Sequence, residues 1–379
     1  MSPRSILVSA GEASGDYYAA LLVDELRRRW PACEFLGCAG PGLRAAGVRP
    51  VIRAEDLAVV GLAEVVGHLP RIWKRFRELI RAATRERPDL AILTDSSGFH
   101  FRVAPKLKML GIPVVYLVAP QVWAWRKGRV KKMPAMIDRL LCIFPFEEAF
   151  FRAHGVPVTY IGHPLARRIK PALTRVEFFR KHNLPLDRPL IAVLPGSRRS
   201  EVLRHIPPLV RAAQILSGEE QLSFILPAAR NCGTAFFESA LAGSCIRAIE
   251  GEAWDAMAHC DVALAASGTV TVEAALLGAP MVTFYKVTSL SWAIGKLLVD
   301  VPFYSMVNLI AEKEVVPELM QSAMTGERIA AETRRLLHDQ TIRAKMKEEL
   351  AAVAARLAGD DVDPMMLAAD EVVRVWEAK

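Results

Sequence analysis

The sequence predicts an α/β protein made of two doubly wound domains in series. Short apolar runs alternate with helical patterns through the first half of the chain, and the alternation restarts after a polar stretch that carries several prolines. With 379 residues, the chain is also longer than one ordinary hydrophobic core requires. We therefore expect one domain at 1–168 and a second at 169–359, with a last helix at about 360–379 that packs back on the first domain.

Each expected element is placed by its pattern of apolar residues. In the first domain, strands are expected at 5–9, 34–37, 90–94, 114–117, 139–143 and 158–161, and helices at about 17–29, 69–85, 101–110, 126–135 and 146–154. In the second domain, strands are expected at 190–194, 223–226, 262–265 and 281–284, and helices at about 201–216, 234–242 and 270–277. Such sheets bind ligands at the carboxyl ends of their strands, so both sets of strand ends are expected to face a central cleft.

The composition is typical of a globular protein without a membrane span. Hydrophobic residues make up 52% and charged residues 24%, and no apolar stretch is long enough to cross a bilayer. The first residues enter a strand without a signal-peptide pattern, so we expect a cytoplasmic protein. The 6 cysteines show neither a C-x-x-C motif nor zinc spacing, so we expect reduced, structural cysteines.

Much of the net charge of +8 lies in one predicted helix, where basic residues alternate with aromatic ones. This helix carries Arg71, Trp73, Lys74, Arg75 and Phe76. A basic, aromatic helix is typical of an element that lies on an anionic membrane. The pattern is equally typical of a surface helix whose apolar stripe faces the core. Nucleic acid is a further alternative partner, although no recognised nucleic-acid motif is present.

In the first domain, three segments at predicted strand ends are candidates for chemistry. The first strand runs into a turn with Gly11, Glu12, Ser14, Gly15 and Asp16, whose glycines lie too far apart for a dinucleotide fingerprint. The start of the next helix can bind an anion or a sugar hydroxyl, or the turn can be a plain capped one. The strand 90–94 leads into Asp95, a position suited to a general base or to a turn-forming Asp. The loop 119–125, with Gln121 and Trp123, suits stacking on a sugar, contact with lipid chains, or ordinary packing.

In the second domain, two turns combine small residues with a charged side chain. Gly196, Ser197 and Arg198 offer backbone N–H groups beside a forked cation, which suits phosphate oxygens. Ser267, Gly268 and Thr269 begin a helix against which a diphosphate can lie. Glu273 follows in that helix, where it can accept hydrogen bonds from a ribose or simply favour the positive helix end. Capped turns with solvated side chains are the alternative for both.

In this order and spacing, these motifs resemble those of lipid-A-disaccharide synthases, which are inverting glycosyltransferases with two Rossmann-like domains, the GT-B architecture. The resemblance covers essentially the whole chain. It rests on the segments 9–16, 60–65, 119–125, 162–165 and 194–198, on 267–269 with Glu273, and on 308–309 followed by 316–318.

The resemblance implies transfer of 2,3-diacylglucosamine from UDP-2,3-diacylglucosamine to 2,3-diacylglucosamine 1-phosphate (lipid X), giving UDP and the β-1,6-linked disaccharide 1-phosphate of lipid A biosynthesis. It implies that Asp95 is the base, that Arg198 stabilises the departing diphosphate, that Glu273 holds the ribose and that Asn308 lies near the donor. No metal or cofactor is needed. We expect attachment to the cytoplasmic face of an anionic inner membrane and no nucleic-acid partner. The chain is expected to be a monomer or a homodimer. In a homodimer, the C-terminal helix can pack on its own chain or be exchanged between the subunits.

The chain departs from the family at one motif. The family commonly reads Asp-Ala-Pro-Asp-Phe-Asn where this chain has Asp95-Ser96-Ser97-Gly98-Phe99-His100, so the second acid and the Asn are missing. A UDP-N-acetylglucosamine 2-epimerase or another glycosyltransferase on the same fold is the nearest alternative, and the basic aromatic helix argues against the epimerase. A non-catalytic binder of nucleic acid or anionic membrane is the alternative from another class.

Overall fold

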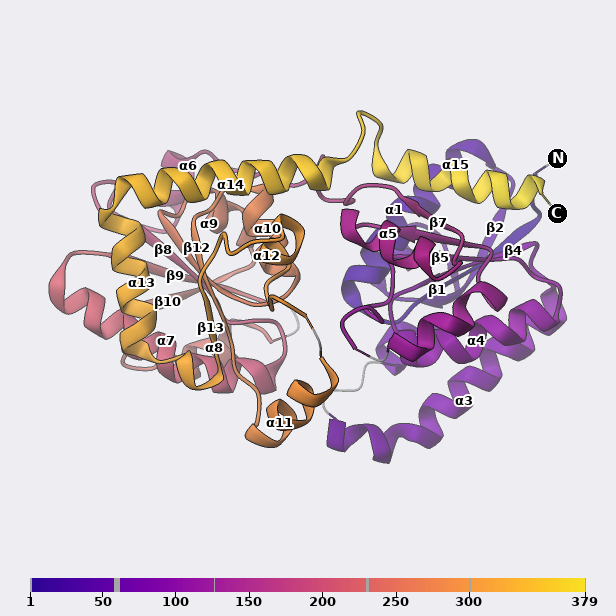
Figure 1. The fold of residues 1–379 in the computed structure, drawn as a ribbon, viewed down its shortest axis with the longest axis horizontal. Coiled ribbons are helices and arrows are strands. Elements are labelled where there is room, and N and C mark those ends of the chain that lie inside the picture. The colour runs from indigo at the N-terminus through magenta and orange to yellow at the C-terminus, as the bar shows by residue number, and fades with distance from the viewer. Residues whose placement is uncertain (1, 58–61, 126, 230–231, 300, 379) are drawn as a thin grey trace. The chain divides into compact units, whose positions relative to one another are not determined.

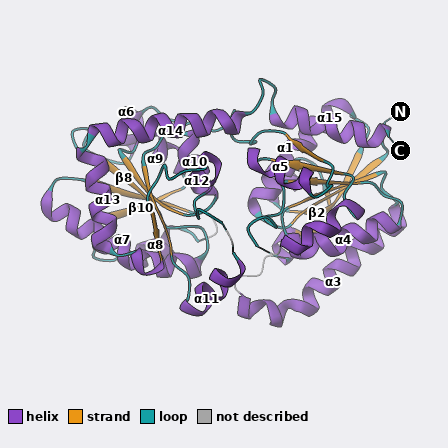
Figure 2. Ribbon diagram, in the orientation of Figure 1, coloured by secondary structure: helices purple, strands orange, loops and turns teal. Residues whose placement is uncertain are grey.

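The computed structural model describes residues 2–57, 62–125, 127–229, 232–299 and 301–378, which fall into two compact units. Unit 1 comprises Met1–Pro164 and Leu357–Lys379, and unit 2 comprises Leu165–Arg356. In each unit a parallel sheet lies between helices on both faces (Figures 1 and 2). The predicted fold class of two doubly wound α/β domains is therefore confirmed. The first boundary between the units lies at 164/165, where the sequence predicts 168/169.

Unit 1 has a sheet of seven strands in the order β3-β2-β1-β4-β5-β6-β7, all parallel. The strands are β1 (Ser5–Ala10), β2 (Glu34–Ala39), β3 (Arg49–Arg53), β4 (Leu90–Thr94), β5 (Val114–Leu117), β6 (Arg139–Cys142) and β7 (Val158–Tyr160). Its helices are α1 (Ala13–Arg29), α2 (Pro41–Ala45), α3 (Leu62–Glu86), α4 (Ser97–Met109), α5 (Pro145–Ala153) and α15 (Pro364–Glu377), with 3₁₀ turns at Ala54–Asp56 and Lys127–Ala135. The segment predicted as a helix at 126–135 is thus a 3₁₀ helix over its described part, which contains Pro134.

Unit 2 has a sheet of six strands in the order β10-β9-β8-β11-β12-β13, again all parallel. The strands are β8 (Leu190–Leu194), β9 (Ser223–Ala228), β10 (Ile246–Glu250), β11 (Val262–Ala266), β12 (Met281–Tyr285) and β13 (Glu318–Met320). The helices are α6 (Arg175–Lys181), α7 (Arg199–Glu219), α8 (Thr234–Ala240), α9 (Ala253–His259), α10 (Thr269–Leu276), α11 (Ser289–Leu298), α12 (Met306–Ala311), α13 (Gly326–His338) and α14 (Gln340–Ala358), with a 3₁₀ turn at Gln321–Ala323.

The hydrophobic core of each unit is built on its central strands. Every residue of β4 and of β5 is buried, because helices cover both faces of the sheet. The C-terminal helix α15 contacts α1, β5 and β6 of its own chain, and Arg29 on α1 lies 2.5 Å from Asp370. The oligomeric state stays a prediction.

Over the part of the chain that the structure describes, no helix is both long and apolar enough to cross a membrane. The cysteines are all free. Within the same ranges, no group of His, Cys, Asp and Glu side chains has the arrangement of a metal site.

Asp16 holds α2 in place rather than facing a ligand. Its buried carboxylate accepts hydrogen bonds from the backbone N–H groups of Gly40 (2.7 Å), Gly42 (2.7 Å) and Leu43 (3.3 Å). These N–H groups lie at the start of α2, where the first backbone N–H groups of a helix have no acceptor within the helix itself. The sequence predicts Asp16 as part of the acceptor loop, and in the structure both of its carboxylate oxygens accept from these backbone amides.

Replacing Asp16 with Ala is expected to destabilise unit 1. The change leaves buried N–H groups without an acceptor, and each lost bond to a charged group costs about 1.5–3 kcal/mol. Urea unfolding of Asp16→Ala is therefore expected to show a free energy of unfolding lower by at least about 2 kcal/mol. Asp24→Ala, at an exposed position of the same helix, is the control. Equal stability of the two variants would contradict this role.

Candidate active site

Each sheet reverses its strand order once, and the predicted site residues gather at those points. In unit 1 the reversal lies between β1 and β4, and in unit 2 between β8 and β11. Neighbouring loops diverge to opposite faces of the sheet there, which leaves a crevice at the carboxyl ends of the strands. In each unit, the turns that follow these two neighbouring strands therefore lie side by side at the carboxyl ends of the sheet.

In unit 1, the Asp95 carboxylate lies against the turn that follows β1. Oδ1 accepts a hydrogen bond from Gly11 N at 3.0 Å, and Oδ2 accepts one from Glu12 N at 3.1 Å. These amides stand where α1 begins, and the positive end of a helix favours a carboxylate. The structure thus brings Asp95 together with the glycine turn.

The glycines of this turn are needed for the approach of Asp95. A Cβ on Gly15 would lie 1.6 Å from Asp95 Oδ2, and one on Gly11 would lie 2.1 Å from Ser96 Oγ. Any larger residue would push the carboxylate away. The turn is therefore shaped around the Asp95 side chain, and of its other predicted residues Glu12 and Ser14 are exposed.

The surroundings of Asp95 make it a weaker acid than usual. Burial of the carboxylate away from water and, second, the negative charge of Glu12 raise the pKa of Asp95 to about 7. Hydrogen bonds from Ser96 and from the backbone act in the opposite direction and lower this pKa. The residue stays partly exposed, so a substrate can reach it. A carboxylate of this kind can take up a proton near neutral pH.

The loop 119–125 contains both a buried and an exposed candidate residue. Trp123 is buried, and its Nε1 donates to the buried Glu147 at 3.0 Å, so ordinary packing is the correct alternative for this ring. Gln121 is exposed and lines a small crevice with Ser97 and Trp125. Of the two loop residues predicted for the acceptor, Gln121 therefore lies near the Asp95 turn and Trp123 belongs to the core.

In unit 2, the turn after β8 presents an exposed cation. Gly196 has φ of +108°, a backbone conformation that favours glycine, and Ser197 and Arg198 are exposed. Arg198 NH1 donates to Glu201 Oε1 at 3.0 Å, and the same oxygen accepts from the hydroxyl of Tyr285 at 2.9 Å. A carboxylate and a strand residue thus orient the guanidinium beside the start of α7.

The turn after β11 is open at its helix end. Ser267 Oγ donates to the carbonyl of Tyr304 at 2.7 Å, Gly268 precedes α10, and Thr269 is exposed. Glu273 Oε2 accepts a hydrogen bond from Trp254 Nε1 at 2.8 Å, and burial raises the pKa of its carboxyl. Among the described residues nothing bonds to its other oxygen, so Glu273 can still accept from a ligand hydroxyl.

Asn308, predicted to lie near the donor, has its side chain engaged in hydrogen bonds within unit 2. It is fully buried in α12, where Nδ2 donates to Val316 O and Glu318 Oε1, both at 2.9 Å. Its Oδ1 accepts from the N–H groups of Val315 and Val316. Glu318 in turn accepts from Tyr304 N at 2.9 Å. Asn308 therefore fixes the loop whose Tyr304 carbonyl receives the Ser267 hydroxyl.

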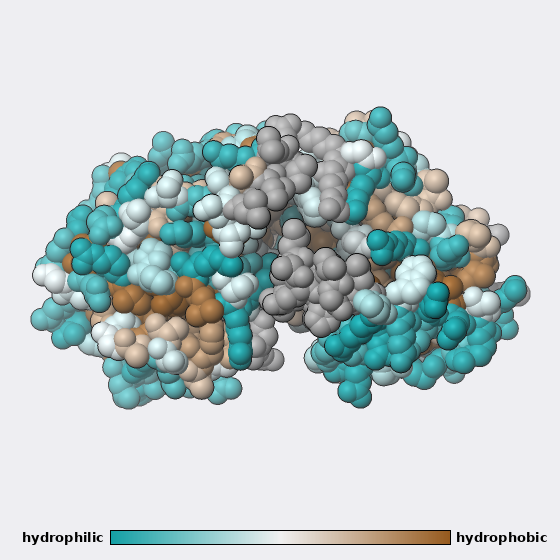
Figure 3. All heavy atoms as spheres, turned by 90° about the horizontal axis from the view of Figure 1, so that it is seen from below, coloured by the Kyte–Doolittle hydropathy of each residue, from teal (hydrophilic) through white to brown (hydrophobic). Residues whose placement is uncertain are grey.

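The basic helix α3 mixes exposed and buried positions. Phe76, predicted to face a membrane, is instead buried and packs edge-on against Phe99 of α4. Trp73 is 45% exposed and stacks on Phe76, and Lys74 is exposed beside it. Figure 3 shows a mainly hydrophilic surface over this side of unit 1.

Two of the predicted membrane-facing cations on α3 have acidic partners. Arg71 and Arg75 form ion pairs with Asp56 at 2.6 and 3.0 Å. Of the motif segment 60–65, residues 60 and 61 lie outside the described residues, and 62–65 form the start of α3.

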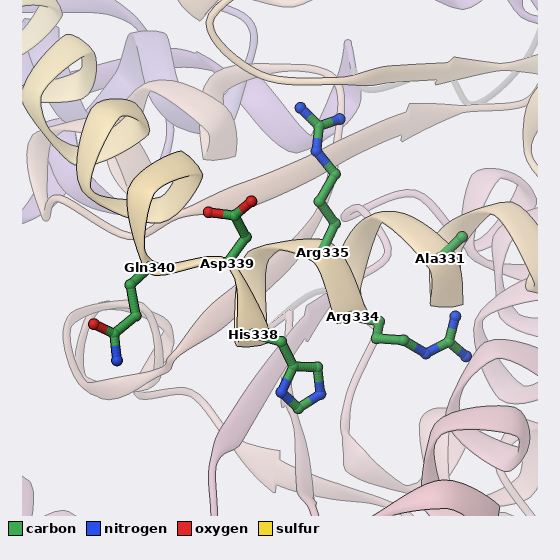
Figure 4. A pocket seen from close by; sticks show the side chains of 6 residues that line it. All are labelled: Ala331, Arg334, Arg335, His338, Asp339 and Gln340. Atoms are coloured by element: carbon green, nitrogen blue, oxygen red, sulfur yellow. The ribbon is translucent and has the colours of Figure 1, made fainter.

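A shallow depression on α13 and the start of α14 holds none of these residues (Figure 4). It is lined by Ala331, Arg334, Arg335, His338, Asp339 and Gln340. Arg334 pairs with Glu219 at 2.6 Å and His338 with Glu220 at 3.1 Å. Arg334 and His338 in this depression are thus engaged with acidic side chains.

Sequence patterns missed the side chains that support these turns. His100 and Tyr116 bond to the carbonyl of Asp95, and Tyr285 bonds to Glu201. Tyr116 lies within an apolar strand, and nothing in such a run shows which distant group its hydroxyl meets. The departure from the family motif at His100 was the one available signal.

Comparisons with known proteins agree with this geometry. A family model described as lipid-A-disaccharide synthetase matches residues 6–361. A curated lipid-A-disaccharide synthase of Solibacter usitatus is 65% identical over 354 residues, which cover 93% of each chain.

Solved structures show the same fold at low identity. A putative UDP-N-acetylglucosamine 2-epimerase from Listeria monocytogenes has a TM-score of 0.65 and 17% identity, over 98% of this chain and 95% of that one. A calicheamicin glycosyltransferase has a TM-score of 0.63 and 18% identity, over 100% and 99%. The fold alone does not separate an epimerase from a transferase, but the family match does. The chain belongs to the lipid-A-disaccharide synthase family of glycosyltransferases.

Proposed function

We propose that this chain transfers 2,3-diacylglucosamine from UDP-2,3-diacylglucosamine to the 6-hydroxyl of 2,3-diacylglucosamine 1-phosphate. The products are UDP and a β-1,6-linked disaccharide 1-phosphate. The observation that carries the proposal is the partly exposed Asp95 carboxylate, which is fixed by two backbone amides and has a pKa of about 7. The family membership supplies the identity of the two sugars.

The reaction is a single displacement at the anomeric carbon. Asp95 accepts the proton of the acceptor hydroxyl while that oxygen attacks the carbon from the side opposite UDP. The bond between the carbon and the diphosphate oxygen breaks, the electron pair leaves with UDP, and the configuration inverts. The fixed position of the carboxylate supports this role, because a base that is already oriented needs little reorganisation.

The leaving diphosphate is assigned to unit 2. Negative charge that grows on its oxygens is stabilised by the exposed Arg198 guanidinium and by N–H groups at Gly268 and Thr269. The orientation of Arg198 by Glu201 supports this assignment. Glu273 is assigned to the ribose hydroxyls. Its Oε1, to which no described residue donates, can accept hydrogen bonds from them.

Asp95→Asn is expected to lower turnover by a factor of about a hundred or more, since the amide cannot take up the proton. The assay follows disaccharide formation from both substrates in detergent micelles. The Asn oxygen can accept from only one of the two turn N–H groups, and its NH₂ group faces the other, so the variant is expected to unfold at a lower temperature than the wild type and is assayed well below that temperature. Wild-type rates in a folded variant would remove Asp95 from the chemistry.

The acidic limb of the pH–rate profile is expected near pH 7. Burial and the charge of Glu12 raise the pKa of Asp95 to about 7, so the base is protonated below that pH and ionised above it. The value of kcat/KM is expected to rise about tenfold per pH unit below the limb and to level off above it. Glu12→Gln removes a negative charge, so its limb is expected at lower pH, while Asp24→Asn serves as control. An unmoved limb in Glu12→Gln would contradict the electrostatic cause.

The protein acts at an anionic membrane surface, in this proposal through the exposed face of α3. Both proposed substrates carry acyl chains, so the sugar headgroups lie at a lipid surface. Trp73 and Lys74 are exposed, and the guanidinium of Arg77 lies 5.4 Å from the Trp73 ring centre. A ring flanked by cations suits the headgroup region of anionic lipids.

Reversing two exposed charges on α3, Lys74→Glu with Arg77→Glu, is expected to weaken binding to vesicles of phosphatidylethanolamine and phosphatidylglycerol by about tenfold or more. Sedimentation with the vesicles measures the bound fraction. Lys345→Glu with Lys347→Glu makes the same change in net charge on α14 and is the matched control. Equal loss in both variants would show that net charge alone matters, and no loss in either would exclude the α3 surface.

A further inference from the structure

The buried His100 joins three adjacent strands at the base of the Asp95 turn. It lies in α4, and its Nδ1 is 3.0 Å from the Asp95 carbonyl oxygen. Its Nε2 is 2.7 Å from Ser9 Oγ on β1. The hydroxyl of Tyr116 on β5 donates to the same Asp95 carbonyl at 2.5 Å. The oxygen that follows β4 is therefore held from both sides.

The contacts of His100 fix its protonation state. A carbonyl oxygen only accepts hydrogen bonds, so Nδ1 carries the proton and donates to Asp95. Burial lowers the pKa of the ring to about 4, so the imidazole is neutral at physiological pH. Nε2 then accepts from the Ser9 hydroxyl, and both ring nitrogens are satisfied in one tautomer.

The carbonyl that His100 holds belongs to a strained turn. Asp95 and Ser96 have φ of +53° and +35°, and neither is a glycine. Two consecutive residues of this kind persist only where the surrounding structure fixes them. The turn brings Asp95 Oδ1 and Oδ2 onto the amides of Gly11 and Glu12. A peptide rotated at Asp95 would point the carboxylate elsewhere.

We propose that His100 is a positioning residue that aims the Asp95 carboxylate by donating from Nδ1 to the Asp95 carbonyl oxygen. The inference rests on the proposed role of Asp95 as base. The Asn that the family commonly has at this position can place an amide N–H where Nδ1 lies. The departure from the family motif thus keeps the donor and changes only the group that supplies it.

Three substitutions of His100 separate the effect of its hydrogen bond to Asp95 from the effect of its packing. His100→Asn keeps an N–H at the place of Nδ1 and gives up the Ser9 contact. His100→Gln reaches the place of Nε2 and gives up the bond to Asp95. His100→Leu fills the space with no polar group. We expect His100→Asn to stay within a few-fold of wild-type kcat, and the other two to lose about ten- to a hundredfold in kcat with KM little changed.

The pH profile gives a readout that a purely structural role would not move. In His100→Gln and His100→Leu the released carboxylate gains water, so the acidic limb is expected at lower pH than in the wild type. The other titratable groups that face Asp95 are Glu12, Tyr116 and Cys38, and all are unchanged in these variants. His100 itself is neutral across the range, so its removal takes away no charge.

A double mutant distinguishes this inference from the proposed function. If His100 acts through Asp95, Asp95→Asn with His100→Leu is no slower than Asp95→Asn alone. Equal kcat in His100→Asn and His100→Gln, or a further loss in the double mutant, would overturn the positioning role while the base stands. Wild-type activity of Asp95→Asn would instead remove Asp95 as the base, and with it this inference, while the absence of disaccharide from the wild type would overturn the proposed function. Thermal unfolding of each variant identifies any that fail to fold, and His100→Asn against His100→Gln then decides.

Discussion

The contact between the Asp95 carboxylate and the amides of Gly11 and Glu12 is the constraint on which unit 1 depends. It joins β1 to β4, the two strands between which the sheet order reverses. A buried carboxylate is costly without donors, and these amides supply them. The same contact requires glycine at Gly15 and a left-handed turn at Asp95. One electrostatic requirement therefore explains the glycines of the first motif and the strain after β4.

Unit 2 holds its turn with a histidine used in the same way. His205 is buried in α7, its Nδ1 lies 2.7 Å from the Pro195 carbonyl, and its Nε2 accepts from Lys286 N at 3.0 Å. Burial lowers the pKa of His205, so a neutral ring serves both contacts. In both units, a neutral histidine on the helix that follows a turn donates a hydrogen bond to a carbonyl at the start of that turn. His100 donates to Asp95, and His205 donates to Pro195. Such a contact fixes the backbone without adding a charge near the ligand.

The sequence predicts the buried centre of each sheet well and its edges poorly. The strands β4, β5 and β8 begin and end where expected, because helices on both faces require unbroken apolar runs. The edge strands β3, β10 and β13 were missed, since they are short or carry charged residues. At the site, a strand end was enough to single out Asp95. The hydrogen-bond partners of Asp16 and Asn308 could not be predicted from the sequence, because these partners are backbone groups that come near only in the folded chain.

The two switch points share a geometry but differ in charge, and this difference suits the two halves of a transfer. In unit 1 the turn is occupied by a carboxylate, with Glu12 beside it, so a diphosphate placed against this turn is disfavoured and a neutral hydroxyl that must lose a proton is favoured. In unit 2 the turns expose a cation and helix amides, which favour a diphosphate. Exchanging the two ligands would place negative charge against Asp95 and leave the attacking hydroxyl without a base. The direction of the proposed transfer therefore follows from which side chain occupies each turn.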